Sequence, residues 1–473
     1  MRMSKRWRVG AARESESQRV GAARESGPWR IAAALAMGFG AGLPASQAAD
    51  LRVPSEYATI QQALDAAQGC DRVLLAPGVH VGSWFIAGDI TVQGDGAAED
   101  VIVDGGGAGV IFSIANGPTV RGLTLRNAGN GVEAYGAWGE IDGCRFEDLD
   151  IGVRSQQALT LVRDSTFNDL RVASIDANRS AITIDRNTVS GSPVGLELVR
   201  STGRVWETVV QDTEWGIRVR EGRFDLMDVL VQGNAAGVTL ETTDSTLSGG
   251  QILGNELGVH VLDADTVMLD TSLANNAIGV LTTFGAAHAR GLVVRDSLQY
   301  GLLDGIGSQS DVADSLFLDN RQAGLLQLAD TRISNVSVVG GQAGFVVLDG
   351  APDLRSVAFV GVAGTALDAA LGPATTHGWN VFWEVGTPSA GGIGEGGDVF
   401  ADPLLDGDGV PGSGSPARDA GDPAPALLDR DGSRNDVGRG GGPDGGSVWE
   451  PLPALAPQIF EHAGYMHPEG SPN

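Results

Sequence analysis

Gly216-Ile217-Arg218-Val219 indicates the architecture of this chain, because the same motif recurs as Gly237-Val238-Thr239-Leu240 and Gly258-Val259-His260-Val261. The step between the leading glycines is 21 residues. A short, steady period of this kind is typical of solenoids, in which each coil buries its apolar face on its neighbours. Continued outward, the leading position falls at Gly109, Gly131, Gly152, Ala173, Gly195, Gly216, Gly237, Gly258, Gly279, Gly301, Gly324, Gly344 and Gly364.

Two apolar columns run through these repeats. One follows the leading position directly, and the other lies about 15 residues further on, at Phe167, Val210, Val231, Ile252, Leu273, Val294 and Phe359. The apolar segments are short, are separated by turn residues and show no helical period, so they predict strands of a coiled parallel sheet. Asn234, Asn255 and Asn276 keep the same step and are expected to stack as a ladder of amides at one bend.

The entry to the repeats has the pattern of a short capping helix. Thr59 and Gln62 have the spacing of a capping box, Ile60, Ala63 and Leu64 form an apolar stripe, and Gly69 follows. The stretch VPSEYATIQQALDAAQGCDRVLLAPGVH resembles the opening of secreted right-handed parallel β-helix proteins of the pectin-lyase-like superfamily. That resemblance implies an all-β, right-handed parallel β-helix with coils of about 21 residues and a helical N-terminal cap. It covers enzymes and non-enzymes alike.

The predicted organisation has five parts. Residues 1–49 are a basic leader and export signal with an apolar run from Ile31 to Leu43, residues 50–79 are the cap, residues 80–371 are the coils, residues 372–450 are a closing module rich in Gly, Pro and Asp, and residues 451–473 are a tail that we expect to be disordered. No apolar run is long enough to predict a membrane span. We therefore expect a secreted, periplasmic or cell-surface protein.

Charge excludes two classes of partner. The 473 residues carry a formal charge of −27, and without residues 1–49 the balance is 24 basic against 56 acidic residues, or −32. Such a surface disfavours nucleic acid and anionic lipid, which bind mainly through Lys and Arg. Lys5 is the only lysine, so no lysine of the mature chain can act as a base. The two cysteines, Cys70 and Cys144, either pair or are buried thiols.

The segment after residue 372 resembles the C-terminal module of the family called choice-of-anchor Q. The matching pieces are Ala401-Asp402-Pro403, Gly414-Ser415-Pro416-Ala417-Arg418-Asp419-Ala420-Gly421 and Asp429-Arg430-Asp431-Gly432. In that family a surface anchor often follows, but the remaining residues contain no sorting motif that would indicate one. Asp406 and Asp408, and Asp429, Asp431 and Asp436, supply enough carboxylate oxygens to be Ca²⁺ ligands, although ordinary solvated turns are the favoured interpretation.

Four carboxylates recur at one phase of the repeat, 12 residues after the leading position: Asp164, Asp185, Glu207 and Asp228. Stacked carboxylates can act as an acid/base pair or hold a cation. Asp residues at such an offset also turn the chain by bonding nearby backbone amides, and repetition favours that structural interpretation. For a glycan, Trp206 and Trp215 lie in one coil and are candidates to flank a binding groove.

The residue two positions after the leading one is expected to face outward. It is charged in early coils, as at Glu133 and Arg154, and apolar in late coils, at Leu281, Leu303, Leu326 and Val346. An exposed apolar strip of that length usually has a cover. The expected cover is part of residues 372–460, including Trp379, Phe382 and Trp383.

These patterns favour an exported, non-catalytic β-helix protein with a structural role or a role in binding a neutral glycan or envelope component. The motifs of known lyases, hydrolases and esterases of this fold are absent from the sequence. The alternative is a polysaccharide-active enzyme, a lyase or glycoside hydrolase, that uses the four carboxylates. No cofactor is expected other than Ca²⁺, and the sequence does not decide the oligomeric state.

Overall fold

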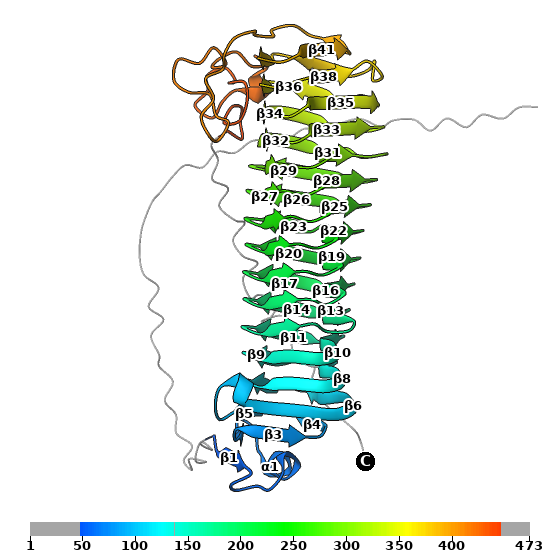
Figure 1. Ribbon diagram of the computed structural model, residues 1–473. Coiled ribbons are helices and arrows are strands. Elements are labelled where there is room, and N and C mark those ends of the chain that lie inside the picture. Colours follow the sequence, from blue (N-terminus) through cyan, green and yellow to red (C-terminus); the bar gives the residue numbers. More distant parts are fainter. Residues whose placement is uncertain (1–47, 137, 446–473) are drawn as a thin grey trace, which may run out of the picture. The chain divides into compact units, whose positions relative to one another are not determined.

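The computed structural model describes residues 48–136 and 138–445. Most of the predicted export signal and all of the predicted tail lie outside these residues. Within them the chain winds into a right-handed parallel β-helix, as predicted. The coils stack from the N-terminal cap upward in Figure 1. No helix among the described residues is long and apolar enough to cross a membrane.

Each regular coil contributes one strand to each of three parallel sheets. The coil that contains Gly216 has β19 (Trp215–Arg220) in the first sheet, β20 (Arg223–Met227) in the second and β21 (Leu230–Gln232) in the third. These strands pair in register with β22, β23 and β24 of the next coil. The three sheets therefore meet at three corners, and every described coil presents three outer faces.

The strands of the first sheet are β4 (Trp84–Ala87), β13 (Ala173–Asn178), β16 (Val194–Val199), β19, β22 (Ala236–Glu241), β25 (Leu257–Leu262), β28 (Ile278–Thr283), β31 (Tyr300–Asp304), β33 (Gln322–Gln327), β35 (Ala343–Asp349), β38 (Thr365–Ala369) and β41 (Thr387–Gly391). Those of the second sheet are β1 (Asp50–Val53), β2 (Arg72–Leu75), β5 (Thr91–Gly94), β7 (Thr119–Arg121), β9 (Trp138–Asp142), β11 (Leu159–Arg163), β14 (Ala181–Asp185), β17 (Thr202–Trp206), β20, β23 (Thr246–Ser248), β26 (Asp265–Leu269), β29 (Ala286–Arg290), β36 (Asp353–Arg355), β39 (Thr376–Gly378) and β42 (Ile393–Gly394).

The third sheet contains β3 (Gly78–Val81), β12 (Thr166–Asn168), β15 (Thr188–Ser190), β18 (Val209–Gln211), β21, β24 (Gln251–Leu253), β27 (Ser272–Ala274), β30 (Val293–Arg295), β37 (Ala358–Val360) and β40 (Val381–Trp383). Five longer strands bend from one sheet into the next: β6 (Val101–Ala115), β8 (Thr124–Tyr135), β10 (Arg145–Gln156), β32 (Asp311–Leu318) and β34 (Arg332–Val339). Two short 3₁₀ helices, Ala98–Asp100 and Pro425–Leu427, complete the inventory.

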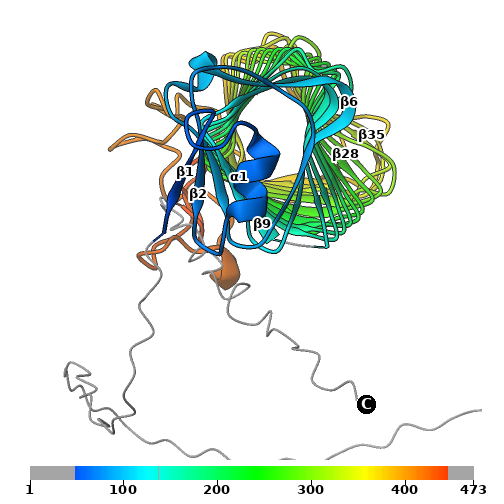
Figure 2. The same cartoon turned by 90° about the horizontal axis from the view of Figure 1, so that it is seen from below.

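The N-terminal helix α1 (Ile60–Ala66) forms as predicted and ends before Gly69. The Oγ1 atom of Thr59 accepts a hydrogen bond from the amide of Gln62 at 3.2 Å, which satisfies one of the free amides of the first turn. Ile60 and Ala63 are buried. Figure 2 shows the helix lying across the end of the coils, so its apolar face closes the N-terminal end of the core.

The leading residues stack in one column, and most of them are glycines because the backbone of the next coil lies close to them. A Cβ atom on Gly258 would lie 2.4 Å from the carbonyl oxygen of Gly279 in the next coil, so a glycine fits best there. The register corrects part of the predicted column: Ala173 pairs with Val194, which puts Ser174 opposite Gly195, and Leu302 pairs with Gly324, which makes Ala323 the leading residue. Ile111 and Ala366 likewise replace Gly109 and Gly364.

The asparagine ladder forms as predicted. The Oδ1 atom of Asn255 accepts hydrogen bonds from the backbone amide and the Nδ2 atom of Asn234, at 2.9 and 3.0 Å, and Asn276 receives the same pair from Asn255. All three side chains are buried. The apolar column that includes Val231 and Ile252 is also buried.

The closing segment does not cover the first sheet, which corrects that prediction. Its first residues extend the three sheets as β39 to β42, and the residues after β42 bond to the coils at the second and third sheets and the corner between them. Examples are Asn435 to Asn335, Gly409 to Ser337 and Asp444 to Arg290. Phe382 is not a lid either, because it stacks on Phe359 inside the core. Figure 1 shows this segment beside β32, β34 and β36.

Both cysteines are free thiols. Cys70 is exposed and Cys144 is buried in the core. Burial raises the pKa of the Cys144 thiol to about 12, so the thiol stays protonated at neutral pH. The structure therefore shows no disulfide between them, and the alternative of two buried thiols holds for Cys144 and not for Cys70.

Candidate functional site

The corner between the first and second sheets carries a column of residues with left-handed backbone. Glu221, Thr242, Asp263 and Phe284 have φ of 50°, 52°, 48° and 55°. Each amide donates to a carbonyl of the following coil, as from Thr242 to Leu262 at 3.0 Å, and the side chain is left pointing outward. This geometry suits glycine and asparagine, and a bulky side chain there is uncommon.

Phe284 is therefore the unusual member of the column. It holds an aromatic side chain in left-handed backbone, and that side chain is 58% exposed. Neither burial in the core nor turn chemistry accounts for a phenylalanine at this place. Bulky residues in sparsely populated backbone regions concentrate at binding and catalytic sites, where the strain is retained for a function.

Beside this column the surface is hollowed. The residues next along the chain, Gly222, Thr243 and Ala264, are small and form the floor. A Cβ atom on Gly222 would lie 2.4 Å from the carbonyl oxygen of Ser201, so the backbone of the neighbouring coil excludes a larger residue there. The Oγ1 atom of Thr243 donates to the carbonyl of Gly222 at 2.6 Å. The result is a hollow of about 560 Å³.

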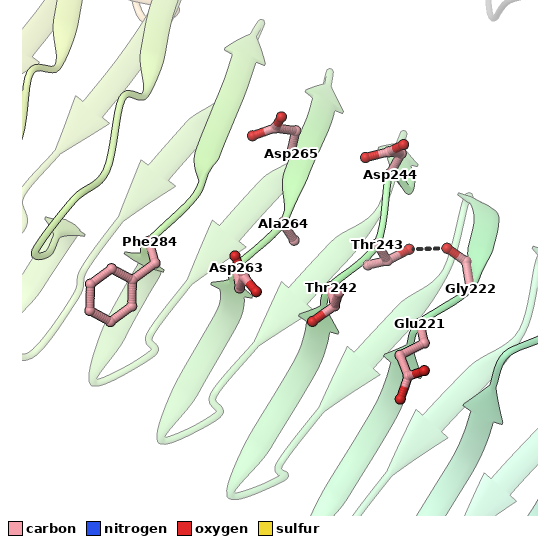
Figure 3. A pocket seen from close by; sticks show the side chains of 9 residues that line it. All are labelled: Glu221, Gly222, Thr242, Thr243, Asp244, Asp263, Ala264, Asp265 and Phe284. Atoms are coloured by element: carbon pink, nitrogen blue, oxygen red, sulfur yellow. Dashed lines mark hydrogen bonds between the residues drawn. The ribbon is translucent and has the colours of Figure 1, made fainter. Parts of the chain in front are cut away.

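Carboxylates and one aromatic ring line the hollow. Asp263 stands on the side of the first sheet and Asp244 and Asp265 on the side of the second, while Glu221 and Phe284 mark the two ends (Figure 3). Arg200 of the preceding coil binds Glu221 at 2.8 Å, and this hydrogen bond lowers the pKa of that carboxyl. The described residues that line the hollow include no basic side chain. Four coils at about 4.8 Å spacing make it roughly 14 Å long.

Such a surface can accept many hydrogen bonds and can stack one ring. Ionised carboxylates are acceptors only, and the two threonine hydroxyls both donate and accept. A ligand rich in hydroxyl groups with an apolar ring face fits this combination, whereas an anionic ligand would be repelled.

The predicted acidic column lies at a different corner, between the second and third sheets. Asp164, Glu207 and Asp228 have left-handed backbone there, and their amides donate to the next coil. Asp185 is not in the column: it pairs in register with Arg163 and Trp206, and Arg186 takes the expected place. Arg186 binds Asp164 at 2.9 Å and lowers the pKa of its carboxyl. The column thus has an arginine between Asp164 and Glu207, and its residues form the turns between the second and third sheets.

The two tryptophans do not share one groove. Trp206 ends β17 of the second sheet and Trp215 begins β19 of the first, and each ring is covered by an arginine, Arg204 at 5.7 Å and Arg218 at 4.6 Å from the ring centroids. Trp215 lines a separate hollow of about 450 Å³ at the corner between the third and first sheets, with Glu214, Glu256, Leu257 and Ile278 among its neighbours.

The predicted calcium ligands serve as turn acceptors. Asp406 accepts from the amides of Asp408 and Val410, and Asp431 accepts from Ser433. Asp429 accepts from the amide of Asp436, whose own carboxylate accepts from the amide of Asp419. No three His, Cys, Asp or Glu side chains of residues 48–136 and 138–445 form a group that could hold a metal ion.

Sequence reasoning missed the hollow because its residues are dispersed. Glu221, Thr242, Asp263 and Phe284 are 21 residues apart and individually ordinary, and Asp244 and Asp265 follow two of them. The signal available in the sequence was Phe284, because the three preceding coils have a polar residue at the same position of the repeat.

Comparisons with known proteins show a distant likeness in fold and identify no family. No family model matches the chain, and no curated protein matches it. Solved structures similar to it include an alginate lyase from Paenibacillus sp. (17% identity, 52% of this chain, 94% of the other, TM-score 0.32) and a mannuronic acid specific polysaccharide family 6 lyase from human gut microbiota (12%, 66% and 86%, 0.38). A surface adhesin of Streptococcus pneumoniae is similar too (9%, 67% and 87%, 0.34). Likeness this distant does not indicate what this chain binds.

Proposed function

We propose that this protein binds a neutral polysaccharide in the hollow between the first and second sheets, acting at the cell envelope or outside the cell. The observation that carries the proposal is Phe284, an exposed aromatic held in left-handed backbone at the end of a hollow lined by carboxylates and hydroxyls. The ring supplies a stacking surface for the apolar face of a sugar. Asp244, Asp263 and Asp265 accept hydrogen bonds from its hydroxyl groups.

The test is a panel of neutral and acidic polysaccharides, with binding and release of reducing ends measured in parallel. Phe284→Asn removes the ring and leaves a residue that tolerates left-handed backbone. Leu328→Asn is the matched control, because Leu328 is also apolar, 45% exposed and left-handed (φ 54°) and does not line the hollow. We expect Phe284→Asn to weaken binding of a neutral glycan at least tenfold and Leu328→Asn to leave it unchanged. Equal loss in both variants would refute the proposed site.

One observation supports a second candidate, hydrolysis of the bound glycan. Asp225 lies on the outer face of β20, one coil before Asp244, and burial raises the pKa of its carboxyl. A general acid needs a raised pKa, and a nearby ionised carboxylate could act as its partner. Asp225→Asn would then abolish release of reducing ends without affecting binding. Binding of a glycan with no reducing ends released from any of the panel would exclude this candidate and leave the first intact.

A further inference from the structure

The outer face of the first sheet changes character along the coils. One column of outward residues is charged in the early coils, at Asp176, Glu197 and Arg218. It then becomes apolar at Leu281, Leu303, Leu325 and Val346, which pair in successive registers and are all partly exposed. The register corrects the prediction by one residue here, because Leu326 is fully buried and Leu325 faces outward.

A second apolar column runs beside the first. It contains Leu257, Ile278 and Tyr300, each three residues before the outward residue of the first column in the same strand. Leu298, at the corner before Tyr300, is 66% exposed. The closing segment bonds to the other two sheets, and Figure 2 shows it on the opposite side of the coils from β28 and β35. The two columns together form the apolar patch of the first sheet, which the closing segment leaves open.

The patch is large enough for an interface between two copies of the chain. Its five coils, from the coil of Leu257 to that of Val346, span about 24 Å, and a strand of six residues with the residue before it spans about 23 Å. The footprint is about 550 Å² per copy and about 1,100 Å² for two copies, which exceeds the roughly 1,000 Å² expected of a specific interface. The exposed Asp263 and Asp349 lie at the corner with the second sheet, outside this footprint.

Charge at the start of the strands decides how two copies can face each other. The residue just before each strand is Glu256, Ala277, Gln299 and Arg321 in successive coils, and both charged side chains are exposed. A two-fold axis along the strand of Leu303 makes the copies antiparallel and places Arg321 of one copy against Ala277 of the other, one coil or about 4.8 Å from Glu256. Parallel copies would instead put Glu256 against Asp263, which follows the same strand, so like charges would meet.

We infer that the apolar patch of the first sheet is the interface of an antiparallel homodimer. In this dimer Leu303 lies against Leu303 of the second copy, Leu281 against Leu325 and His260 against Val346. Apolar residues therefore meet at the centre, and each exposed arginine approaches a glutamate at the border. A glycan does not fit the patch, because leucine side chains form no hydrogen bonds with hydroxyl groups. The inference does not depend on the proposed glycan site, which opens at the corner with the second sheet.

The first test is sedimentation velocity of the full chain over about 1–100 µM protein, at about 0.15 M salt, where long-range repulsion between acidic copies is screened. Leu303→Arg places two arginines on the two-fold axis, and the fold accepts an arginine there because Arg218 occupies the same column. Val267→Arg is the matched control, because Val267 is 37% exposed on the second sheet in a column that contains Arg204.

A charge exchange tests the antiparallel register. Arg321→Glu and Glu256→Arg each bring like charges together across the axis, whereas R321E/E256R restores opposite charges. Within one chain these two residues are three coils apart, about 14 Å, so a rescue requires contact between copies. Circular dichroism of every variant checks that the coils have formed.

We expect a dimer in the micromolar range that Leu303→Arg weakens at least tenfold and Val267→Arg leaves unchanged. Each single exchange should weaken it at least threefold, and the double exchange should recover the affinity to within about twofold. A monomer at about 100 µM, or equal weakening by Leu303→Arg and Val267→Arg, would overturn the inference. A double exchange that is no tighter than the single ones would overturn the antiparallel register. Phe284→Asn should dimerise normally, which separates this result from the glycan proposal.

Discussion

At the scale of the residue, the fold depends on where the chain has no space for a side chain. The leading glycines face the carbonyl oxygens of the next coil, and a Cβ atom on Gly195, Gly237 or Gly258 would lie 2.4–2.5 Å from that oxygen. Ser174 and Ala323 occupy the same column where the step lengthens to 22 residues, so the coil tolerates a Cβ atom only where its spacing adjusts.

Gly258→Ala is expected to destabilise the protein by about 1–3 kcal/mol, the usual cost of overpacking a tight site. The control is Gly109→Ala, because a Cβ atom on Gly109 meets no atom within 4 Å. Urea unfolding followed by circular dichroism would show a lower midpoint for Gly258→Ala alone. A similar fall of the midpoint in both variants would mean that replacing any glycine destabilises the protein, whether or not the glycine lies in the column.

At the scale of the element, the stacked asparagines couple one coil to the next. Each side chain holds the backbone amide of the preceding coil, so the ladder fixes the corner between the third and first sheets. The 21-residue step predicted this ladder and the two apolar columns, because both depend only on period. It did not predict which residues share a corner: a single shift in register moves Asp185 out of a column and Arg186 into it.

Asn255→Ala should cost about 1–3 kcal/mol for each buried group that it leaves without a partner. The group that loses its acceptor is the backbone amide of Asn234, whereas the Nδ2 atom of Asn234 keeps the carbonyl of Val210 and the Oδ1 atom of Asn276 keeps the backbone amide of residue 255. Asn178→Ala on the outer face of the first sheet is the control and should change the unfolding midpoint little. Hydrogen exchange should also speed up at the amide of Asn234 in Asn255→Ala. Unchanged protection of that amide would contradict the ladder as a stabilising element.

At the scale of the whole described body, sequence predicted the architecture and an outward apolar column but missed the hollow. The core and the ladder follow from what every coil shares, and the helix cap follows from its capping residues. The hollow arises from a difference between coils, Phe284 after Asp263, which a search for the period does not detect. The closing segment was placed on the wrong face because its contacts, such as Asn435 with Asn335, join residues that are 100 apart and follow no repeat.

The whole molecule should be more stable at pH 5 than at pH 8. Burial raises the pKa of Asp304, Asp314 and Asp436, so the folded state favours their protonated form, and stability falls as pH rises from about 4, the unfolded value, through the raised values. The lowered carboxyl pKa values of Asp71, Asp104 and Asp164 contribute stability that disappears only below about pH 4, so they do not change this window. Self-repulsion of a chain at −27 acts in the same direction as the buried carboxyls.

Salt separates the two causes, because about 0.5 M NaCl screens surface repulsion and affects buried groups much less. We expect the melting temperature at pH 5 to exceed that at pH 8 in both low and high salt, by a smaller margin in high salt. Asp304→Asn should reduce the remaining difference, since Asp304 is fully buried and accepts hydrogen bonds from uncharged groups, including the hydroxyls of Ser310 and Thr331. Asp212→Asn, at an exposed corner, should not. A melting temperature that is independent of pH in high salt would mean that the buried carboxyls titrate as they do in the unfolded chain.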